Sequence, residues 1–313
     1  MFTFIQKISK YAESNSLVFL LKKSELDLEL PISEEEHDYL KAQHKDHEQS
    51  SFLFDRLHFQ IYIEIIEEKS EDNHTLELLR KTANGLLEVI QKKKTQEIFI
   101  LGPGFNATEI LAFTEGMVLG NYRFTAYKTK KGKTIRYLET IKLVSENISQ
   151  EQIEELNILM EATLTARTLV NKPVNYLNAT ELSEEIKNMA YDSGAKIEIF
   201  NKNKIEALKM GGLLAVNQGS PLPPTFSIFE YKPENAVNSK PLIFVGKGVV
   251  YDTGGLNIKT GVSMNDMKCD MGGAAAASAA AFAIAKAKLP LYVMALVPAT
   301  DNRPGEMLMP VEM

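Results

Sequence analysis

Short apolar runs and stretches with helical periodicity alternate along the first half of this chain. Apolar runs at residues 17–21, 60–66 and 96–101 predict strands, because runs of this length between polar or turn residues fit a buried strand. The third run stops at Gly102-Pro103-Gly104, which predicts a turn. Apolar positions at helical spacing predict helices over 75–92 and 107–122. Strands and helices are therefore mixed in this part of the chain.

A basic segment, KTKKGK, lies between two short runs that favour extended structure, at residues 124–127 and 134–137. Gly132 lies within the segment, so we expect a β-hairpin with this glycine in its turn. A basic tip can contact phosphate, but a solvated turn is the simpler interpretation.

The second half begins with a long helical pattern over 151–170, followed by alternating helices and strands. We expect helices at 181–194, 202–210 and 272–285, and strands at 196–200, 213–217, 225–231, 241–246 and 289–299. The pattern predicts an α/β protein of two domains. Residues 1–150 form a smaller N-terminal α/β domain. Residues 151–313 form a linker helix and the first part of a mixed-sheet domain with helices on both faces.

Composition narrows the functional class. The net charge of −6 argues against general nucleic-acid binding, which requires clustered Lys and Arg. A single cysteine, Cys269, rules out a disulfide framework within the chain and fits a reducing compartment. The N-terminus has no signal-peptide pattern, and the longest apolar run, residues 272–285, is too short and too rich in alanine to span a membrane. We therefore expect a cytoplasmic protein without membrane partners, and a buried helix over 272–285.

The histidines exclude several kinds of active site in the second domain. All five (His37, His44, His47, His58 and His74) lie in the first domain. A Ser-His-Asp triad, a Cys-His pair using Cys269, or an HExxH zinc site cannot be built from the second domain alone. Metal ligands in that domain must be carboxylates, carbonyls or an unusual group such as a neutral lysine.

One segment of the second domain, residues 245–273, concentrates candidate chemistry. Lys247 and Asp252 follow a predicted buried strand, and Lys259 and Asp270 come next along the chain. Glycines surround the first two, and Gly272-Gly273 follows Asp270 after one residue, so the backbone can approach a ligand or a neighbouring helix closely. Neither the G-x-G-x-x-G nor the Walker phosphate-binding pattern is present. Because ligands bind at the carboxyl ends of strands in α/β sheets, we expect the site here.

This segment resembles the active-site region of the leucine aminopeptidase (cytosol aminopeptidase) metallopeptidases. The family pattern G-K-G-x-x-[FY]-D-[ST]-G-G, a lysine, and M-x-x-D-M-G-G-A-A matches residues 246–255, Lys259 and residues 267–275. Residues 166–185 and 210–224 are similar to the start of the family's catalytic domain, and the first domain matches only around residues 111–127.

The resemblance implies two divalent metal ions, Mn²⁺ or Zn²⁺, and a role for each matching residue. Lys247 would bind one metal through a neutral amine, a state that a nearby cation and burial favour. Asp252 would bridge both metals, and Asp270 would bind the same metal as Lys247. Lys259 would stay charged and polarise the scissile carbonyl or stabilise the oxyanion. Met267 would line the pocket for the substrate's N-terminal side chain. The family also implies peptide substrates with bulky apolar N-terminal residues and a homohexamer.

The family's second metal-ligand motif, N-T-D-A-E-G-R, does not occur in the sequence. Two divalent ions bring a charge of +4, and Asp252 and Asp270 supply only −2, so we expect further carboxylates from that motif. Asp301 and Glu306 correspond to the loop before it. We therefore expect this chain to be a fragment of a longer protein, and we expect the strand near 291–297 to be left at an unpaired edge.

Two alternatives to the aminopeptidase interpretation remain. The first is a truncated, catalytically inactive relative that serves as a binding or assembly module, which the downstream reading frame would distinguish. The second is an α/β nucleotide-binding protein centred on Gly246 and Gly248, which equilibrium dialysis with ATP and NAD would test.

Overall fold

The computed structural model describes residues 3–67, 72–128 and 138–305, and it divides into two compact units, residues 1–160 and 161–313. The sequence predicts a domain boundary near Gln150, which is the first residue of helix α4 (Gln150–Asn171). The division between the units falls inside this helix, after Met160.

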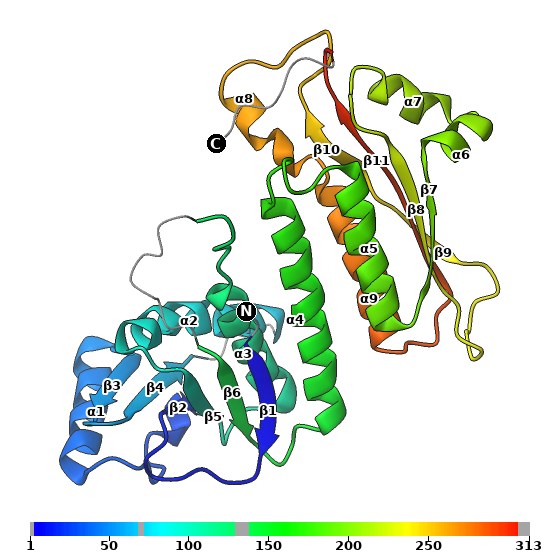
Figure 1. Cartoon of the computed structure of the whole chain (residues 1–313). Helices are drawn as coiled ribbons and strands as arrows, with labels where there is room; N and C mark the ends of the chain where they lie inside the picture. The colour runs from blue at the N-terminus through cyan, green and yellow to red at the C-terminus, as the bar shows by residue number, and fades with distance from the viewer. Residues whose placement is uncertain (1–2, 68–71, 129–137, 306–313) are drawn as a thin grey trace. The chain divides into compact units, whose positions relative to one another are not determined.

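The N-terminal unit contains a mostly parallel sheet in the order β1-β6-β5-β2-β4-β3 (Figure 1). Its strands are β1 (Phe4–Ile8), β2 (Leu17–Lys22), β3 (Ser51–Asp55), β4 (Gln60–Ile66), β5 (Glu97–Leu101) and β6 (Thr140–Val144). All neighbouring pairs are parallel except β3 and β4. The structure confirms the strands predicted at 17–21, 60–66 and 96–101.

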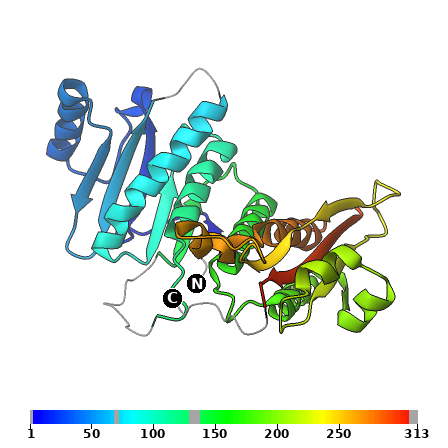
Figure 2. The same ribbon diagram turned by 90° about the horizontal axis from the view of Figure 1, so that it is seen from above.

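The helices of this unit are α1 (Glu34–His47), α2 (Asp72–Lys93) and α3 (Ala107–Asn121), with a short 3₁₀ turn, η1 (Lys23–Glu25). Helices α2 and α3 pack against each other, on the opposite side of the sheet from α1 (Figure 2). The helices predicted over 75–92 and 107–122 are confirmed. Helix α3 begins where Asn106 and Glu109 cap each other's backbone amides, which satisfies two N–H groups at the helix start.

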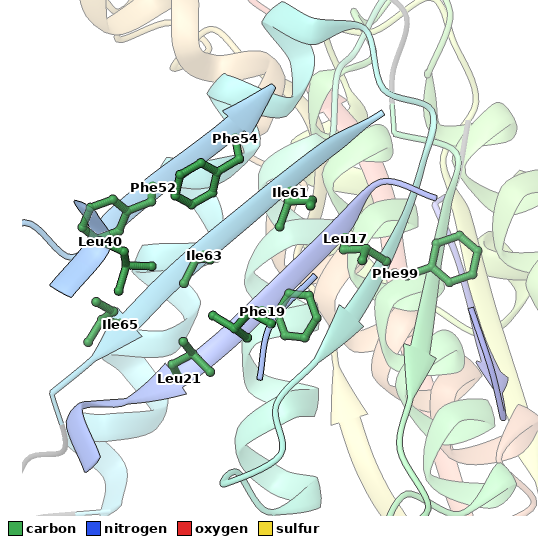
Figure 3. Close-up of a cluster of buried hydrophobic side chains, with 11 residues drawn as sticks. Leu17, Phe19, Leu21, Leu40, Phe52, Phe54, Ile61, Ile63, Ile65 and Phe99 are labelled. Atoms are coloured by element: carbon green, nitrogen blue, oxygen red, sulfur yellow. The ribbon is translucent and has the colours of Figure 1, made fainter. Parts of the chain in front are cut away.

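Apolar side chains from alternate strand positions form the core on the α1 face of this sheet (Figure 3). The buried cluster includes Leu17, Phe19 and Leu21 of β2, Ile61, Ile63 and Ile65 of β4, Phe52 and Phe54 of β3, Phe99 of β5 and Leu40 of α1. Each such side chain contributes ~1.5–3 kcal/mol by leaving water. The period of two along β2 and β4 thus determines which residues face α1.

The hairpin predicted around KTKKGK is not found in its described half. Residues 124–127 form no strand and end in a turn in which Tyr127 has a φ of 67°. Residues 134–137 and Gly132 lie outside the described residues. The left-handed backbone at Tyr127 is incompatible with an extended strand.

The C-terminal unit contains a mixed sheet in the order β10-β11-β8-β7, with β9 also paired to β11 (Figure 1). The strands are β7 (Lys196–Phe200), β8 (Thr225–Tyr231), β9 (Leu242–Val245), β10 (Gly248–Asp252) and β11 (Val293–Asn302). Helices α5 (Ala179–Ser193) and α9 (Gly272–Lys286) pack side by side on one face, and α6 (Lys202–Ala207) and α7 (Gly211–Asn217) lie on the other. The expected mixed sheet with helices on both faces is confirmed.

The alanine-rich run forms helix α9, nine of whose residues are buried. The prediction of a buried helix is therefore confirmed. Among the described residues, none of the helices combines the length and the hydrophobicity needed to cross a bilayer.

Two predictions for this unit are wrong. Residues 213–217 belong to helix α7, not to a strand. The buried residue of α7 is Asn217, whose side chain donates hydrogen bonds to Leu222 O (2.9 Å) and Thr300 Oγ1 (3.1 Å). Strand β11 is not an edge strand, because β8 pairs with one side of it and β9 and β10 with the other. These pairings join segments distant in sequence, so local pattern does not reveal them.

Candidate metal centre

The candidate site begins at a break between β9 and β10, two consecutive strands that both pair with the same edge of β11. Val245, the last residue of β9, pairs with Leu296, and Gly248, the first residue of β10, pairs with Ala299. The backbone therefore keeps its register across the break, where Lys247 lies. Strand β9 thus continues into β10 after a two-residue interruption, and Lys247 in this interruption does not belong to either strand.

Helix α9 approaches this break closely. The amide of Ala274, in the first turn of α9, donates to Lys247 O at 3.0 Å. A Cβ atom at Gly246 would lie 2.6 Å from Ala274 Cα, which no side chain tolerates. Glycine at 246 is therefore required for the contact that fixes the backbone of Lys247 against α9.

Asp252 is the last residue of β10, and its carboxylate accepts hydrogen bonds from three donors. A register shift between Val249 and Asp252 places Asp252 opposite Asn302 of β11. Oδ1 of Asp252 accepts hydrogen bonds from the Gly254 amide (3.0 Å) and Asn302 Nδ2 (2.7 Å), and Oδ2 accepts one from the Lys259 amine. Burial raises the pKa of Asp252, but hydrogen bonds from Lys259, Gly254 and Asn302 outweigh it and hold the pKa below its ordinary value.

A tight loop returns Lys259 to Asp252. Gly254 and Gly255 have φ values of 88° and 63°, in the left-handed region that favours glycine. The Lys259 amide then donates to Thr253 O at 2.8 Å, which closes the loop. The amine of Lys259 also lies 3.0 Å from Met267 Sδ. The loop thus places a cation against both the carboxylate of Asp252 and the side chain of Met267.

Asp270 follows the short helices α8 (Val262–Asn265) and η2 (Asp266–Cys269), and η2 packs against β10. Oδ1 of Asp270 forms an ion pair with Lys247 at 2.6 Å. The Asp270 side chain is 20% exposed and that of Lys247 is 59% exposed. Oδ2 of Asp270 is buried and accepts no hydrogen bond from the described residues. Its lone pairs are therefore available to a further ligand.

The structure brings the five residues predicted from the sequence into two neighbouring groups. Asp252 contacts Lys259, which contacts Met267, and Lys247 contacts Asp270. The donor set suits a divalent cation in part, because carboxylate oxygens are the ligands that hard cations prefer and one oxygen of Asp270 is unpaired. In the described part of the chain, no three His, Cys, Asp or Glu side chains lie close enough to hold a metal together.

Sequence reasoning missed Asn302, which contacts Asp252 directly. Asn302 ends β11, and β10 and β11 are parallel, so their carboxyl ends lie at the same edge of the sheet. A polar residue at that edge is the signal that could have found it. On either side of Asn302, Asp301 and Arg303 form a buried ion pair with each other.

Two family models match the chain. The catalytic-domain model of the cytosol aminopeptidase family matches residues 164–311, and the N-terminal-domain model of the same family matches residues 69–131. A probable cytosol aminopeptidase of Chloroherpeton thalassium is 41% identical over 210 residues, covering 61% of this chain and 40% of the relative. One from Clostridium perfringens is 34% identical over 256 residues, covering 76% of this chain and 52% of the relative. The chain spans about half the length of these curated relatives.

Solved structures share the fold at low identity. A tomato leucine aminopeptidase variant superposes with a TM-score of 0.75 at 20% identity, over 99% of this chain and 64% of that chain. The bottromycin maturation enzyme BotP in complex with Mn also gives a TM-score of 0.75, at 22% identity, over 95% of this chain and 62% of that chain.

Proposed function

Because this chain belongs to the cytosol aminopeptidase family, we propose that it carries part of the active site of a metal-dependent aminopeptidase. The proposed reaction removes N-terminal residues, preferably bulky and apolar ones such as leucine, from peptides. The observation that carries the proposal is the pairing of two carboxylates with two lysines, in the region where η2 packs against β10.

We assign Lys247, Asp252 and Asp270 to the binding of divalent cations, two in number and either Mn²⁺ or Zn²⁺. When bound, such a pair of cations supplies the Lewis acidity that activates water and stabilises negative charge. The unpaired Oδ2 of Asp270 supports its role as a ligand. The Mn complex of BotP, which shares the fold, makes manganese the first ion to test.

Two further residues act on the substrate in this proposal. Lys259 keeps its positive charge beside Asp252 and stabilises the oxyanion that forms at the scissile carbonyl. Met267 lies against the Lys259 amine, which supports a role for its side chain in contacting the N-terminal side chain of the peptide. An unbranched thioether adapts to apolar groups of different shape, which suits leucine-like residues.

We also propose that the protein works in the cytoplasm as a homo-oligomer, with a hexamer as the first assembly to test. The curated relatives are named cytosol aminopeptidases, which supports the compartment. Sedimentation velocity of the protein tests the assembly, and a monomer at micromolar concentration would contradict it.

The enzymatic proposal is tested by hydrolysis of leucine p-nitroanilide, using the protein expressed from its full reading frame. We expect activity with Mn²⁺ and none after chelation. Lys259→Ala should lower kcat/KM by over about a hundredfold, because a fixed charge that stabilises an oxyanion contributes this much. Lys268→Ala, a lysine of the neighbouring η2 turn, is the matched control and should stay within about threefold of the unaltered protein. Equal activity of both lysine variants would contradict the role of Lys259.

A further inference from the structure

The carboxylate of Asp252 is held by a residue outside the segment that carries the family motif. Asn302 lies fifty residues further along the chain, yet its Nδ2 donates to Asp252 Oδ1 at 2.7 Å. We propose that Asn302 is a positioning residue, which orients the carboxylate of Asp252 for a divalent cation. This inference rests on the proposed function and adds to it a residue that the sequence did not indicate.

The backbone of Asn302 holds the turn that follows Asp252. The carbonyl oxygen of Asn302 accepts hydrogen bonds from both the amide (3.0 Å) and the hydroxyl (2.7 Å) of Thr253. Asn302 therefore contacts two consecutive residues of this turn, one through its side chain and one through its backbone. The orientation of the Asp252 carboxylate and the path of the turn are fixed by the same residue.

The strand register brings Asn302 to this place. Gly248 pairs with Ala299 and Val249 with Thr300, but Asp252 pairs with Asn302, so β10 has one more residue than β11 over this interval. A bulge of this kind redirects the side chains that follow it. Without the extra residue, Asp252 would not lie opposite Asn302.

The side-chain amide of Asn302 has little freedom. Its Oδ1 lies beside Gly255, where an added Cβ would approach Oδ1 to 2.9 Å. Asp301 and Arg303, the residues on either side, are buried. An amide confined in this way holds its Nδ2 toward Asp252 before any cation binds. Hydrogen bonds to a metal-binding carboxylate typically change the metal affinity by about 10–100-fold.

The test measures Mn²⁺ binding by titration calorimetry on the protein expressed from its full reading frame. We expect Asn302→Ala to raise the dissociation constant for Mn²⁺ by about 10–100-fold. The Mn²⁺ concentration for half-maximal activity should rise by the same factor, and kcat at saturating Mn²⁺ should return to within about threefold of the unaltered protein. A purely structural role would not give this recovery by added metal.

Asn238→Ala is the matched control, because Asn238 holds Tyr292, the residue just before the opposite end of β11. Its Nδ2 donates to Tyr292 O at 2.8 Å, and its Oδ1 accepts from the Tyr292 amide at 2.8 Å. Removing the Asn238 side chain should lower the free energy of unfolding and leave the affinity for Mn²⁺ unchanged. Gly255→Ala is a second variant, which should weaken Mn²⁺ binding both by displacing Asn302 and by straining the left-handed turn at Gly255, and it keeps the test valid if Asn302→Ala fails to fold.

The outcomes separate this inference from the proposed function. If the unaltered protein binds Mn²⁺ and both Asn302→Ala and Gly255→Ala bind it equally well, the positioning role is wrong and the metal site stands. If Asn238→Ala weakens binding as much as Asn302→Ala, the effect is a general one of β11 and the positioning role is again wrong. If the unaltered protein binds no Mn²⁺, both proposals fail.

Discussion

Each unit of this protein holds a carboxyl group on a strand, buried in the N-terminal unit and partly exposed in the C-terminal unit, and the pKa values of the two groups shift in opposite directions. Glu64 of β4 in the N-terminal unit is 4% exposed, and in the described part of the chain its hydrogen-bond partner is the Ser51 hydroxyl at 2.6 Å. Burial raises the pKa of Glu64 to about 7. Asp252 in the C-terminal unit is hydrogen-bonded by Lys259, Gly254 and Asn302, and its pKa is lowered in spite of burial.

The comparison shows that burial and hydrogen-bond partners act together on a carboxyl group, because Glu64 is the more deeply buried and also has the weaker partner. A single neutral hydroxyl does not offset the loss of hydration at Glu64, whereas one cation and two N–H donors do so at Asp252. The carboxylate of Asp252 therefore stays negative at neutral pH, as a metal ligand must. Glu64 lies among apolar strand residues, and the described residues give it the Ser51 hydroxyl in place of such a set of donors.

The largest expected difference between the two carboxyl groups is in catalysis. Asp252→Ala should lower leucine p-nitroanilide hydrolysis by over about a hundredfold, because the change removes a proposed metal ligand. Glu64→Gln keeps the size of the side chain and should leave activity within about threefold when assayed where both proteins are folded. Comparable losses in the two variants would show that the assay reports folding and not the chemistry of Asp252.

A second difference is in the pH dependence of stability. The pKa of Glu64 lies at about 7 in the folded protein and at 4.5 when unfolded, so the folded state binds more protons between these values. The stability that protonated Glu64 supports is therefore fully present below about pH 4.5. It is lost as the pH rises to about 7, because ionisation of the buried carboxyl lowers the free energy of unfolding. Glu64→Gln should remove this loss, which amounts to on the order of 3 kcal/mol at most.

Urea unfolding of the N-terminal unit at pH 5 and at pH 8 measures this effect. The free energy of unfolding of Glu64→Gln should exceed that of the unaltered protein by more at pH 8 than at pH 5. A difference that is the same at both pH values would contradict the raised pKa of Glu64.

The smallest expected effect concerns the backbone beneath the site. Gly246→Ala places a methyl group 2.6 Å from Ala274 Cα, and we expect a loss of ~1–3 kcal/mol from the free energy of unfolding. The displaced backbone should also weaken Mn²⁺ binding through Lys247. Gly211→Ala is the matched control, since an added Cβ there meets no other described element within 4 Å, and it should be neutral or slightly stabilising. Equal stability of the two variants would argue against the close approach of α9.

The sequence predicted those elements whose pattern is local. Strands β2 and β4 and helix α5 were found from apolar spacing, and the end of α5 from Gly194, which takes the left-handed conformation at the helix C-terminus. The helix α7 was missed because five residues cannot establish a period, and because its buried residue is the polar Asn217. The central place of β11 follows from pairing with β8, β9 and β10, which no local pattern records.

The same distinction applies to the candidate site. Lys247, Asp252, Lys259, Met267 and Asp270 lie in one segment of fewer than thirty residues, so a motif captured all of them. Asn302 reaches the site through the register of β10 against β11. Such a residue can be identified only when the strand pairing is known, because a strand bulge determines which side chain faces Asp252.

The most direct test of the account is anomalous diffraction at the manganese absorption edge, from crystals of the protein grown with Mn²⁺. We predict anomalous peaks within bonding distance of the side chains of Lys247, Asp252 and Asp270. Peaks located elsewhere, or a fully occupied manganese site that these three side chains do not contact, would contradict the assignment of this segment as a metal centre.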